Sequence, residues 1–295
     1  MTPDEHLVGV EPEADGLDLR SLDTITPEET AAFRSYYERV KGASMPALEF
    51  WLEFRPDVMK RYRAGVRQTT SSEEQAHPLL HGMAMLHYYA VTGFEDGISY
   101  EVRLVNAGGA TKAEVIDMLA VAFLHASPRG MRFVERAATP LLRQWEEPAS
   151  VSWWPDGWRF DPERLSSGAD FSRPDASPDD IEQIVNWYEV TLGEVPAYVS
   201  FLAVNRPGLL KAFRNRFEHA IRDALPTEMM VYALLNLHVA QARPDGIREY
   251  ALLGRAIGMT RAQLLDAICW GVYYGGLDAL GVASQAAGDV LDSVA

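Results

Sequence analysis

The sequence has 295 residues and a single cysteine, Cys269. One thiol excludes an intramolecular disulfide, a thiolate-rich metal site and a two-cysteine redox centre within one chain. Basic residues are also scarce, because 27 lysines and arginines stand against 42 aspartates and glutamates, for a formal net charge of −15. A surface this acidic repels phosphate backbones and anionic lipids, so we expect no nucleic-acid or membrane partner.

Long apolar runs and strand-like alternation are missing as well. The uncharged stretch 229–242 is shorter than the ~18 to 20 residues needed to span a bilayer, and it indicates a buried helix. Residues 1–16 are acidic and lack the basic start and apolar run of a secretory signal, so we expect a cytoplasmic protein. With 47% apolar residues the chain can bury a large core. At roughly 150 residues per domain, its length predicts about two domains.

The chain does contain an internal repeat. The tripeptide Asp96-Gly97-Ile98 recurs 149 residues later as Asp245-Gly246-Ile247, and the same offset relates four more pairs: Gly109 and Gly258, Thr111 and Thr260, Ala113 and Ala262, Asp117 and Asp266. Upstream, an offset of 151 relates Tyr37 to Tyr188 and Arg55-Pro56 to Arg206-Pro207. The pattern predicts a tail (1–25), a first repeat (26–143), a linker (144–176) and a second repeat (177–295).

Each repeat is predicted to be helical. Thr26 and Ser177 are followed by proline and two acidic residues, which is the pattern of a capped helix start. Two capping boxes follow a glycine turn, namely Thr111 with Glu114 and Thr260 with Gln263. The helices after these boxes, 115–124 and 264–274, are apolar nearly all round, so we expect them inside a bundle. The predicted fold is all-α, with two tandem helical bundles.

The linker holds four of the seven tryptophans of the chain: Trp145, Trp153, Trp154 and Trp158. Large aromatic side chains gain most from burial, so we expect an ordered segment that packs over one or both repeats. Two roles stay open for it, a strap between the repeats or a lid over a pocket.

This succession of a long apolar helix, a short turn, a helix followed by Gly-x-Thr and a capped buried helix resembles the carboxymuconolactone decarboxylase and alkylhydroperoxidase D superfamily. It occurs twice, in residues 93–124 and 242–273. The resemblance implies a helical, oligomeric enzyme that uses no metal or organic cofactor and acts on a small anionic molecule. Two repeats in one chain would replace two subunits of a single-repeat ring, so a homotrimer or homodimer is expected.

The catalytic motif of the peroxidase branch, Cys-x-x-Cys-x-x-x-His, has no counterpart here. Its positions fall at Phe94, Gly97 and Glu101 in the first repeat and at Arg243, Gly246 and Tyr250 in the second. A peroxidase cycle needs a thiolate and a resolving thiol, so neither repeat can run it. The decarboxylase branch keeps only the histidine of this motif, and glutamate stands at that position in the first repeat.

Three residues of the first repeat are candidates for acid/base chemistry. Glu101 interrupts a stripe of apolar residues on one helix face, and burial raises the pKa of a carboxyl toward neutral pH. His87 precedes the turn before Glu101, and His125 ends the helix that follows, so both are predicted to approach the same pocket. Each of the three is equally compatible with a buried structural role.

Four residues are candidates for substrate binding: Arg243, Tyr250, His238 and Arg103. Arg243 occupies the position of the first motif cysteine, where a guanidinium suits a substrate carboxylate, although a surface arginine in a turn is the plainer interpretation. His77 and His81 have a spacing that can hold zinc, but Pro78 between them indicates a helix start and no third ligand follows, so we expect no metal.

These residues leave three functional hypotheses. The first is a cofactor-independent lyase or isomerase, decarboxylase-like, that acts on a small carboxylated lactone, diacid or aromatic-derived metabolite. The second is a non-catalytic protein that uses the thiol-less scaffold to bind a small ligand or a partner. The third, an intermolecular redox role of Cys269, requires an exposed thiol, whereas the apolar helix around it predicts a buried and inert one.

Overall fold

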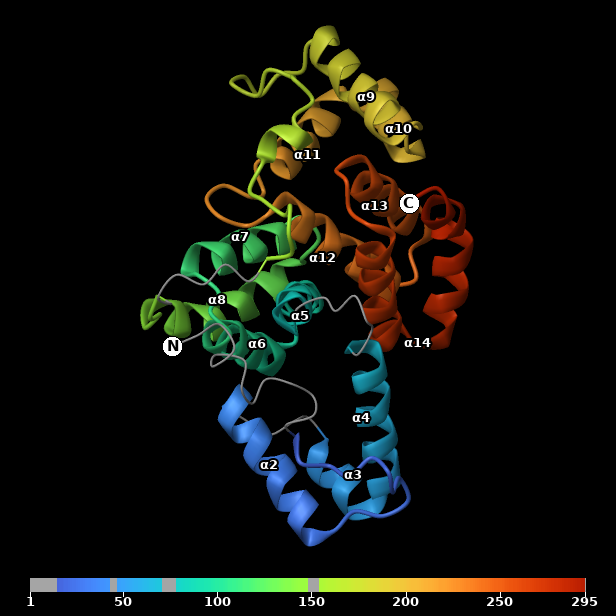
Figure 1. Ribbon diagram of the computed structural model, residues 1–295. Coiled ribbons are helices and arrows are strands. Elements are labelled where there is room, and N and C mark those ends of the chain that lie inside the picture. Colours follow the sequence, from blue (N-terminus) through green and yellow to red (C-terminus); the bar gives the residue numbers. More distant parts are fainter. Residues whose placement is uncertain (1–14, 43–46, 71–77, 148–153, 295) are drawn as a thin grey trace. The chain divides into compact units, whose positions relative to one another are not determined.

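The computed structural model describes residues 15–42, 47–70, 78–147 and 154–294, and its regular elements there are helices (Figure 1). The chain divides into two compact units. Of the described residues, unit 1 takes those up to Val115 and those from Ala126 to Pro155. Unit 2 takes Ile116–His125 and those from Asp156 onward. The all-α prediction is confirmed.

Unit 1 is built on three helices that pack against one another, α5 (Pro78–Thr92), α6 (Glu95–Ala107) and α8 (Pro128–Arg143). Helix α2 (Pro27–Lys41) packs on α6, and α3 (Leu48–Phe54) packs on α4 (Pro56–Thr70). Helix α7 (Lys112–Ala122) begins in this unit, and its later turns belong to unit 2.

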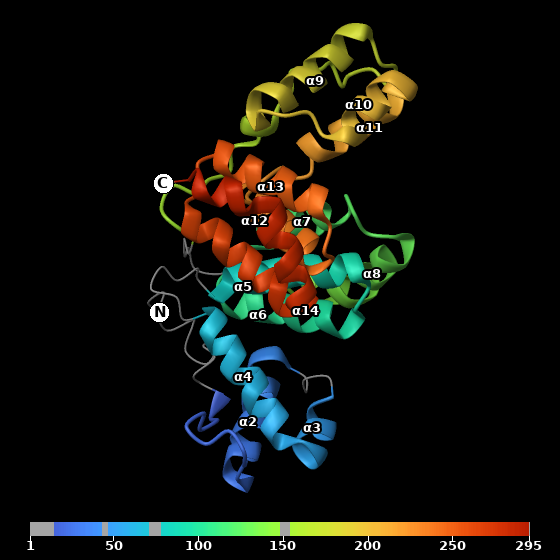
Figure 2. The same cartoon turned by 90° about the vertical axis from the view of Figure 1, so that its right-hand side faces the viewer.

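Unit 2 is also built on three helices that pack against one another. Helices α12 (Thr227–Ala240), α13 (Pro244–Ala256) and α14 (Arg261–Asp292) pack pairwise and lie side by side in Figure 2. Helix α12 is buried along almost its whole length, as expected for this uncharged run. Helix α9 (Pro178–Leu192) contacts α13, α10 (Ala197–Asn205) and α11 (Pro207–Glu218), and a short helix η2 (Pro162–Leu165) precedes it.

The predicted helix starts are confirmed by their hydrogen bonds. The side chains of Thr26, Thr111, Ser177 and Thr260 each accept a bond from the backbone N–H three residues on, at 3.1 to 3.2 Å, and the side chain at that third position accepts one in return. The helix starts also follow the two sequence offsets between the repeats. Helices α5, α6 and α7 begin at positions equivalent to the starts of α12, α13 and α14, and α2 and α4 begin at positions equivalent to those of α9 and α11.

The capped helices pack inside their units on one face only, and the expected burial of Cys269 is wrong. The side chains of Ile116, Phe123 and Leu265 are 45%, 52% and 38% exposed, so these helices are not buried all round. Cys269 in α14 is exposed rather than buried. Only one face of each helix packs inside its unit, and an apolar sequence on all faces does not reveal which face that is. Partial burial and Asp266 raise the pKa of the Cys269 thiol, which disfavours its reactive thiolate.

The structure describes residues 144–147 of the linker and its residues from 154 onward, whereas Trp153 lies outside the described residues. This segment runs over the start of α12. Arg159 N donates to Glu228 at 3.1 Å, Asp161 N donates to the Thr227 hydroxyl at 3.2 Å, and Arg164 forms an ion pair with Glu228. Trp158 is buried. These contacts fasten the segment to unit 2.

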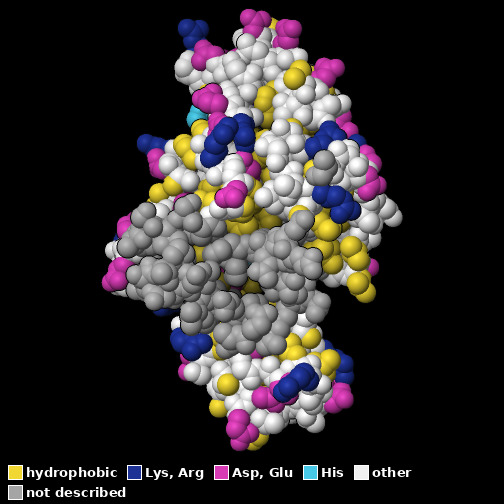
Figure 3. Space-filling model, viewed as in Figure 1, with side chains coloured by type: hydrophobic (Ala, Val, Ile, Leu, Met, Phe, Trp, Pro, Cys, Tyr) yellow, Lys and Arg dark blue, Asp and Glu magenta, His cyan; other side chains and the backbone are white. Residues whose placement is uncertain are grey.

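The surface is mixed in character. Figure 3 shows acidic and basic side chains spread over the viewed face, with hydrophobic side chains gathered over α14, where Leu277 is 83% exposed. Helix α14 bends next to this residue, because Gly276 has a left-handed φ of 74°. Among the described residues, no helix is both long and apolar enough to cross a membrane.

Candidate functional site

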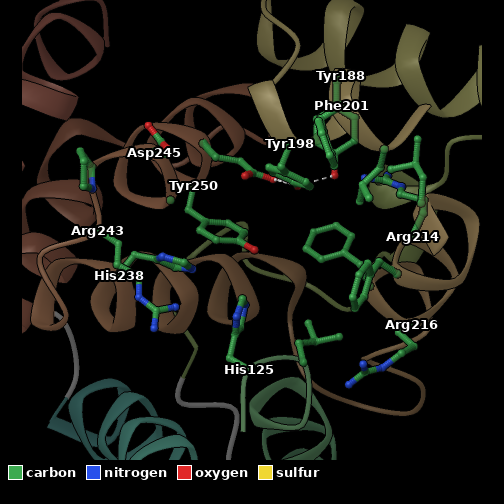
Figure 4. Close-up of a pocket in the computed structure, with 18 of the residues that line it drawn as sticks. His125, Tyr188, Tyr198, Phe201, Arg214, Arg216, His238, Arg243, Asp245 and Tyr250 are labelled. Carbon is green, nitrogen blue, oxygen red and sulfur yellow. Dashed lines mark hydrogen bonds between the residues drawn. The ribbon is translucent and has the colours of Figure 1, made fainter. Parts of the chain in front are cut away.

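Unit 2 contains a cavity of about 750 Å³ (Figure 4). Its walls come from three places in the sequence: the end of the α7 segment, helices α9 to α11, and the turn between α12 and α13. Most of the lining is apolar. It includes six phenylalanines and tyrosines, namely Tyr188, Tyr198, Phe201, Phe213, Phe217 and Tyr250. A cavity of this size and lining suits a small, largely apolar molecule.

Glu249 on α13 is the carboxyl group in the cavity with the most altered acidity. Burial raises its pKa to about 7, outweighing a hydrogen bond from Tyr198 and the charge of Arg214, which both lower it. The Tyr198 hydroxyl lies 2.9 Å from Oε1 of Glu249 and 3.1 Å from the hydroxyl of Tyr188. Near neutral pH, Glu249 therefore divides between its acid and its carboxylate form, as a general acid/base requires.

Two histidines meet on the opposite wall. The rings of His125 and His238 lie edge to face with centroids 5.1 Å apart, and the ring of Tyr250 lies 5.1 Å from that of His238. Burial lowers the pKa of His125 to about 4, helped by Arg243 and Arg216. Burial, His125 and Arg243 lower that of His238 to about 3. Both rings are thus neutral at pH 7, and neither His238 nitrogen has a hydrogen-bond partner among the described residues.

The place of His238 depends on a glycine. Gly246, in the first turn of α13, is so close to this ring that a Cβ atom there would lie 2.0 Å from Nδ1. The chain also turns tightly before α13, since the Arg243 backbone N–H donates to the carbonyl of His238 at 2.9 Å. Glycine at position 246 therefore allows the imidazole to lie against the backbone of α13.

Three arginines supply positive charge to the cavity. Arg243 is exposed, and its guanidinium makes no hydrogen bond or ion pair with any other described residue. Arg216 donates to the carbonyl of Phe123 at 2.5 Å. Arg214 is buried, lies 3.7 Å from the ring centroid of Trp187 and donates to Glu218 at 2.6 Å. Arg243 is thus the cation best placed to take a ligand carboxylate.

The structure brings four of the seven predicted site residues together. His125, His238, Arg243 and Tyr250 all line the cavity. The other three, Glu101, His87 and Arg103, belong to unit 1 and do not line it. Glu101 on α6 and His87 on α5 are buried, with 2% and 0% of their surface exposed, and Arg103 is exposed.

The residues proposed for zinc gain no support from the described part of the chain. His81 is buried there, and His77 lies outside it. Among the described residues, no group of three or more histidine, cysteine, aspartate or glutamate side chains is arranged to hold a metal ion.

Sequence reasoning missed Glu249, Tyr198 and Arg214. A signal for Glu249 was present, because the dipeptide Tyr100-Glu101 recurs at the offset of 149 in inverted order, as Glu249-Tyr250. The histidine position of the family motif falls at Glu101 and Tyr250, so the motif does not point to their neighbours Tyr100 and Glu249. Arg214 and Tyr198 carry no comparable signal, because only the packing of α10 and α11 brings them to the cavity.

Comparisons with known proteins agree with this architecture. No family model matches the sequence, and no curated protein matches it. Among solved structures, the chain is similar to a crystal structure from Burkholderia xenovorans that carries the provisional name gamma-carboxymuconolactone decarboxylase subunit. The TM-score is 0.55 at 16% identity, over 88% of this chain and 96% of that chain. At this identity the likeness concerns the fold, and the chain has an all-helical fold of the carboxymuconolactone decarboxylase type.

Proposed function

We propose that the cavity of unit 2 is the active site of a cofactor-independent lyase or isomerase that acts on a small carboxylated lactone, diacid or aromatic-derived molecule. The observation that carries this proposal is the place of Glu249, which accepts a hydrogen bond from Tyr198 at 2.9 Å in an aromatic cavity. Burial raises its pKa to about 7, and the same cavity contains Arg243, whose guanidinium has no ion pair among the described residues. The name of the similar solved structure, a decarboxylase subunit, is in keeping with this class of reaction.

Substrate binding follows from the lining. Arg243 and Arg216 both act on the pKa of His125, so positive charge surrounds that end of the cavity, and a substrate carboxylate belongs there. The aromatic side chains, among them Phe201 and Phe217, then hold the apolar body of the substrate. Tyr250 and His238 orient it as neutral hydrogen-bonding groups.

The chemistry assigned to Glu249 is proton transfer. In a decarboxylation, the bond between the substrate carbon and its carboxylate breaks, CO2 leaves, and the electron pair passes to a carbon conjugated with a carbonyl of the substrate. Glu249 in its acid form gives its proton to that carbon, and the resulting carboxylate regains a proton from water. In an isomerisation, the same group removes a proton and returns it elsewhere.

The remaining features of the proposal concern the whole chain. We assign the two halves to a tandem duplication, with repeats at 26–143 and 177–295. The recurrence of equivalent helix starts in the two halves supports this assignment. A cytoplasmic homotrimer or homodimer is the expected form, by analogy with single-repeat rings.

The test is a pair of matched variants, Glu249→Gln and Glu101→Gln. Wild type and variants are screened by thermal shift against benzoate, muconate and a carboxylated γ-lactone, and each ligand that binds is then assayed for turnover. A ligand at a hundred times its Kd adds about 2.7 kcal/mol of stability. We expect Glu249→Gln to retain binding and lose about 100-fold or more of the rate, with Glu101→Gln close to wild type.

The other outcomes each decide against this proposal in a different way. Loss of rate only in Glu101→Gln transfers the catalytic role to Glu101 and His87 in unit 1. Tight binding without turnover in the wild type identifies a non-catalytic binding protein. If neither the wild type nor a variant binds any of these ligands, small carboxylic acids are excluded as the substrate class.

A further inference from the structure

One carboxylate of the first half is bound by the backbone of the second. Asp117 on α7 is 3% exposed, and it accepts hydrogen bonds from four successive backbone N–H groups. Oδ1 takes the N–H of Arg222 at 3.1 Å, and Oδ2 takes those of the next three residues, Asp223, Ala224 and Leu225, at 3.0 to 3.1 Å. These residues form the loop between α11 and α12.

The loop 222–225 is an anion-binding concavity, and the anion it binds is the carboxylate of Asp117. Four N–H groups that point to one place make a site for negative charge, and hydrogen bonds to a carboxylate are about twice as strong as neutral ones. No ion pair of Asp117 occurs among the described residues, so these bonds are what holds its charge. The loop and the α7 segment therefore hold each other in place.

A second contact fixes the same segment closer to the cavity. The carbonyl of Phe123 accepts a hydrogen bond from Arg216 on α11 at 2.5 Å, and the guanidinium of Arg216 lies 5.3 Å from the centre of the Phe123 ring. The two residues that follow, Leu124 and His125, line the cavity. The cavity wall they form thus depends on a segment held at residues 117 and 123.

We infer that Asp117 is a positioning residue for the cavity of unit 2: its bonds to the loop 222–225 hold the end of α7 so that His125 faces His238 and the ligand. The inference rests on the proposed function of this cavity. It adds that residues from both halves of the chain build the site and that a residue with no contact to the ligand controls it.

The chain provides its own control. Asp266 stands 149 residues after Asp117, at the same place after a capping box, but it accepts a hydrogen bond from the Tyr232 hydroxyl at 2.5 Å. Replacing either aspartate by leucine removes a carboxylate from the same helix position and leaves a side chain of similar size. Only the change at position 117 affects the loop 222–225.

The experiment follows the ring of His125 by NMR titration in the full chain. Burial, Arg243 and Arg216 lower the pKa of this ring to about 4 in the wild type, and the ring of His238 lies edge to face with it. In Asp117→Leu the segment is released into water, so we expect His125 to titrate near ~6.5, the value of an open histidine. The pKa of His238 should rise as well, because His125 is one of the groups that lower it. Asp266→Leu should leave both histidines unchanged.

A conservative variant separates positioning from charge. In Asp117→Asn the one remaining oxygen can face the three N–H groups that Oδ2 now accepts, so His125 should titrate close to the wild-type value. An unchanged titration of His125 in folded Asp117→Leu overturns the inference. If Asp117→Leu does not fold, Asp117→Ser is measured instead. If neither variant folds, Asp117 is required for folding itself, and this result also overturns the inference.

The readout needs no ligand, so it stands apart from the proposed function. A shifted His125 together with a cavity that binds none of the tested acids supports the positioning role and removes only the proposed substrate class. Where a ligand is found, its Kd should rise about tenfold or more in Asp117→Leu and stay unchanged in Asp266→Leu.

Discussion

The hydroxyl of Tyr198 donates a 2.9 Å hydrogen bond to Glu249, the carboxyl group of the cavity that titrates near neutral pH. Tyr198 comes from α10 and Glu249 from α13, so this bond ties together two helices that form different walls of the cavity. It also lowers the pKa of the carboxyl group, because a hydrogen bond to a carboxylate favours its charged form, although burial outweighs this effect.

Removal of this donor should raise the pKa of Glu249. In Tyr198→Phe the carboxylate loses its bond, so we expect the pKa to move above about 7 and the acid form to persist to higher pH. The pH profile of turnover, or the titration of the labelled carboxyl carbon, measures this. Tyr188→Phe keeps the bond from Tyr198 to Glu249 and serves as the control. If the pKa of Glu249 in Tyr198→Phe stays unchanged or falls, the hydrogen bond from Tyr198 to Glu249 is contradicted.

The two cavity histidines should make the fold sensitive to acid. Their pKa values of about 4 and about 3 lie below the ordinary 6.5, so between these values the unfolded chain binds more protons than the folded one. Stability is therefore complete above pH 6.5 and falls as the pH drops toward 4, by about 3 kcal/mol for each histidine.

Urea unfolding between pH 8 and pH 4 measures this loss. The double variant His125→Gln with His238→Gln should show a flatter dependence than the wild type over the same interval. Equal slopes for the two proteins would mean that the histidines are already solvated in the folded state.

Arg243 should distinguish charged from neutral ligands. Arg243→Met removes a guanidinium that has no ion pair in the described part of the chain, so we expect the Kd of a carboxylate ligand to rise by about tenfold and that of its amide analogue to change little. The matched control is Arg255→Met, a change at the other end of α13, where Arg255 donates to the hydroxyl of Ser293. Equal losses of affinity for the carboxylate ligand and its amide analogue would show that the substitution acts through the shape of the cavity.

Gly246 should be intolerant of the smallest side chain. A Cβ at this position would lie 2.0 Å from Nδ1 of His238, so Gly246→Ala must displace the ring and narrow the cavity. We expect ligand binding to be lost. Gly208→Ala in α11 meets no atom within 4 Å and should stabilise the helix by about 0.5 to 1 kcal/mol. Calorimetry with any ligand that binds compares the two, and normal affinity in Gly246→Ala contradicts the packing of His238.

The helix starts could be predicted from sequence because the interactions that make them are local. A capping box joins residues three apart, as in Thr111 with Glu114, and its geometry does not depend on the rest of the fold. The exposure of Cys269 could not be predicted in the same way. Its helix is apolar on every side, and only tertiary packing decides which side faces water.

The candidate site was predictable in part. Arg243 and Tyr250 were found because they stand at positions of a family motif, and both line the cavity. Glu249 was not found, since burial raises its pKa, and its hydrogen-bond partner Tyr198 lies far away in the sequence. The place of His125 depends on the long-range bonds between Asp117 and a loop in the other half of the chain.

The inverted dipeptides Tyr100-Glu101 and Glu249-Tyr250 have a consequence for how such a protein can be altered. Neighbouring side chains on an α-helix point roughly 100° apart. Exchanging two adjacent residues therefore moves the carboxyl group by more than a quarter turn around the helix axis, while the helix keeps the same composition. On α6 the acid is enclosed by core, and on α13 it opens into a cavity. A two-residue transposition is thus a small edit that relocates reactivity, and it leaves the volume available to the surrounding helices nearly constant.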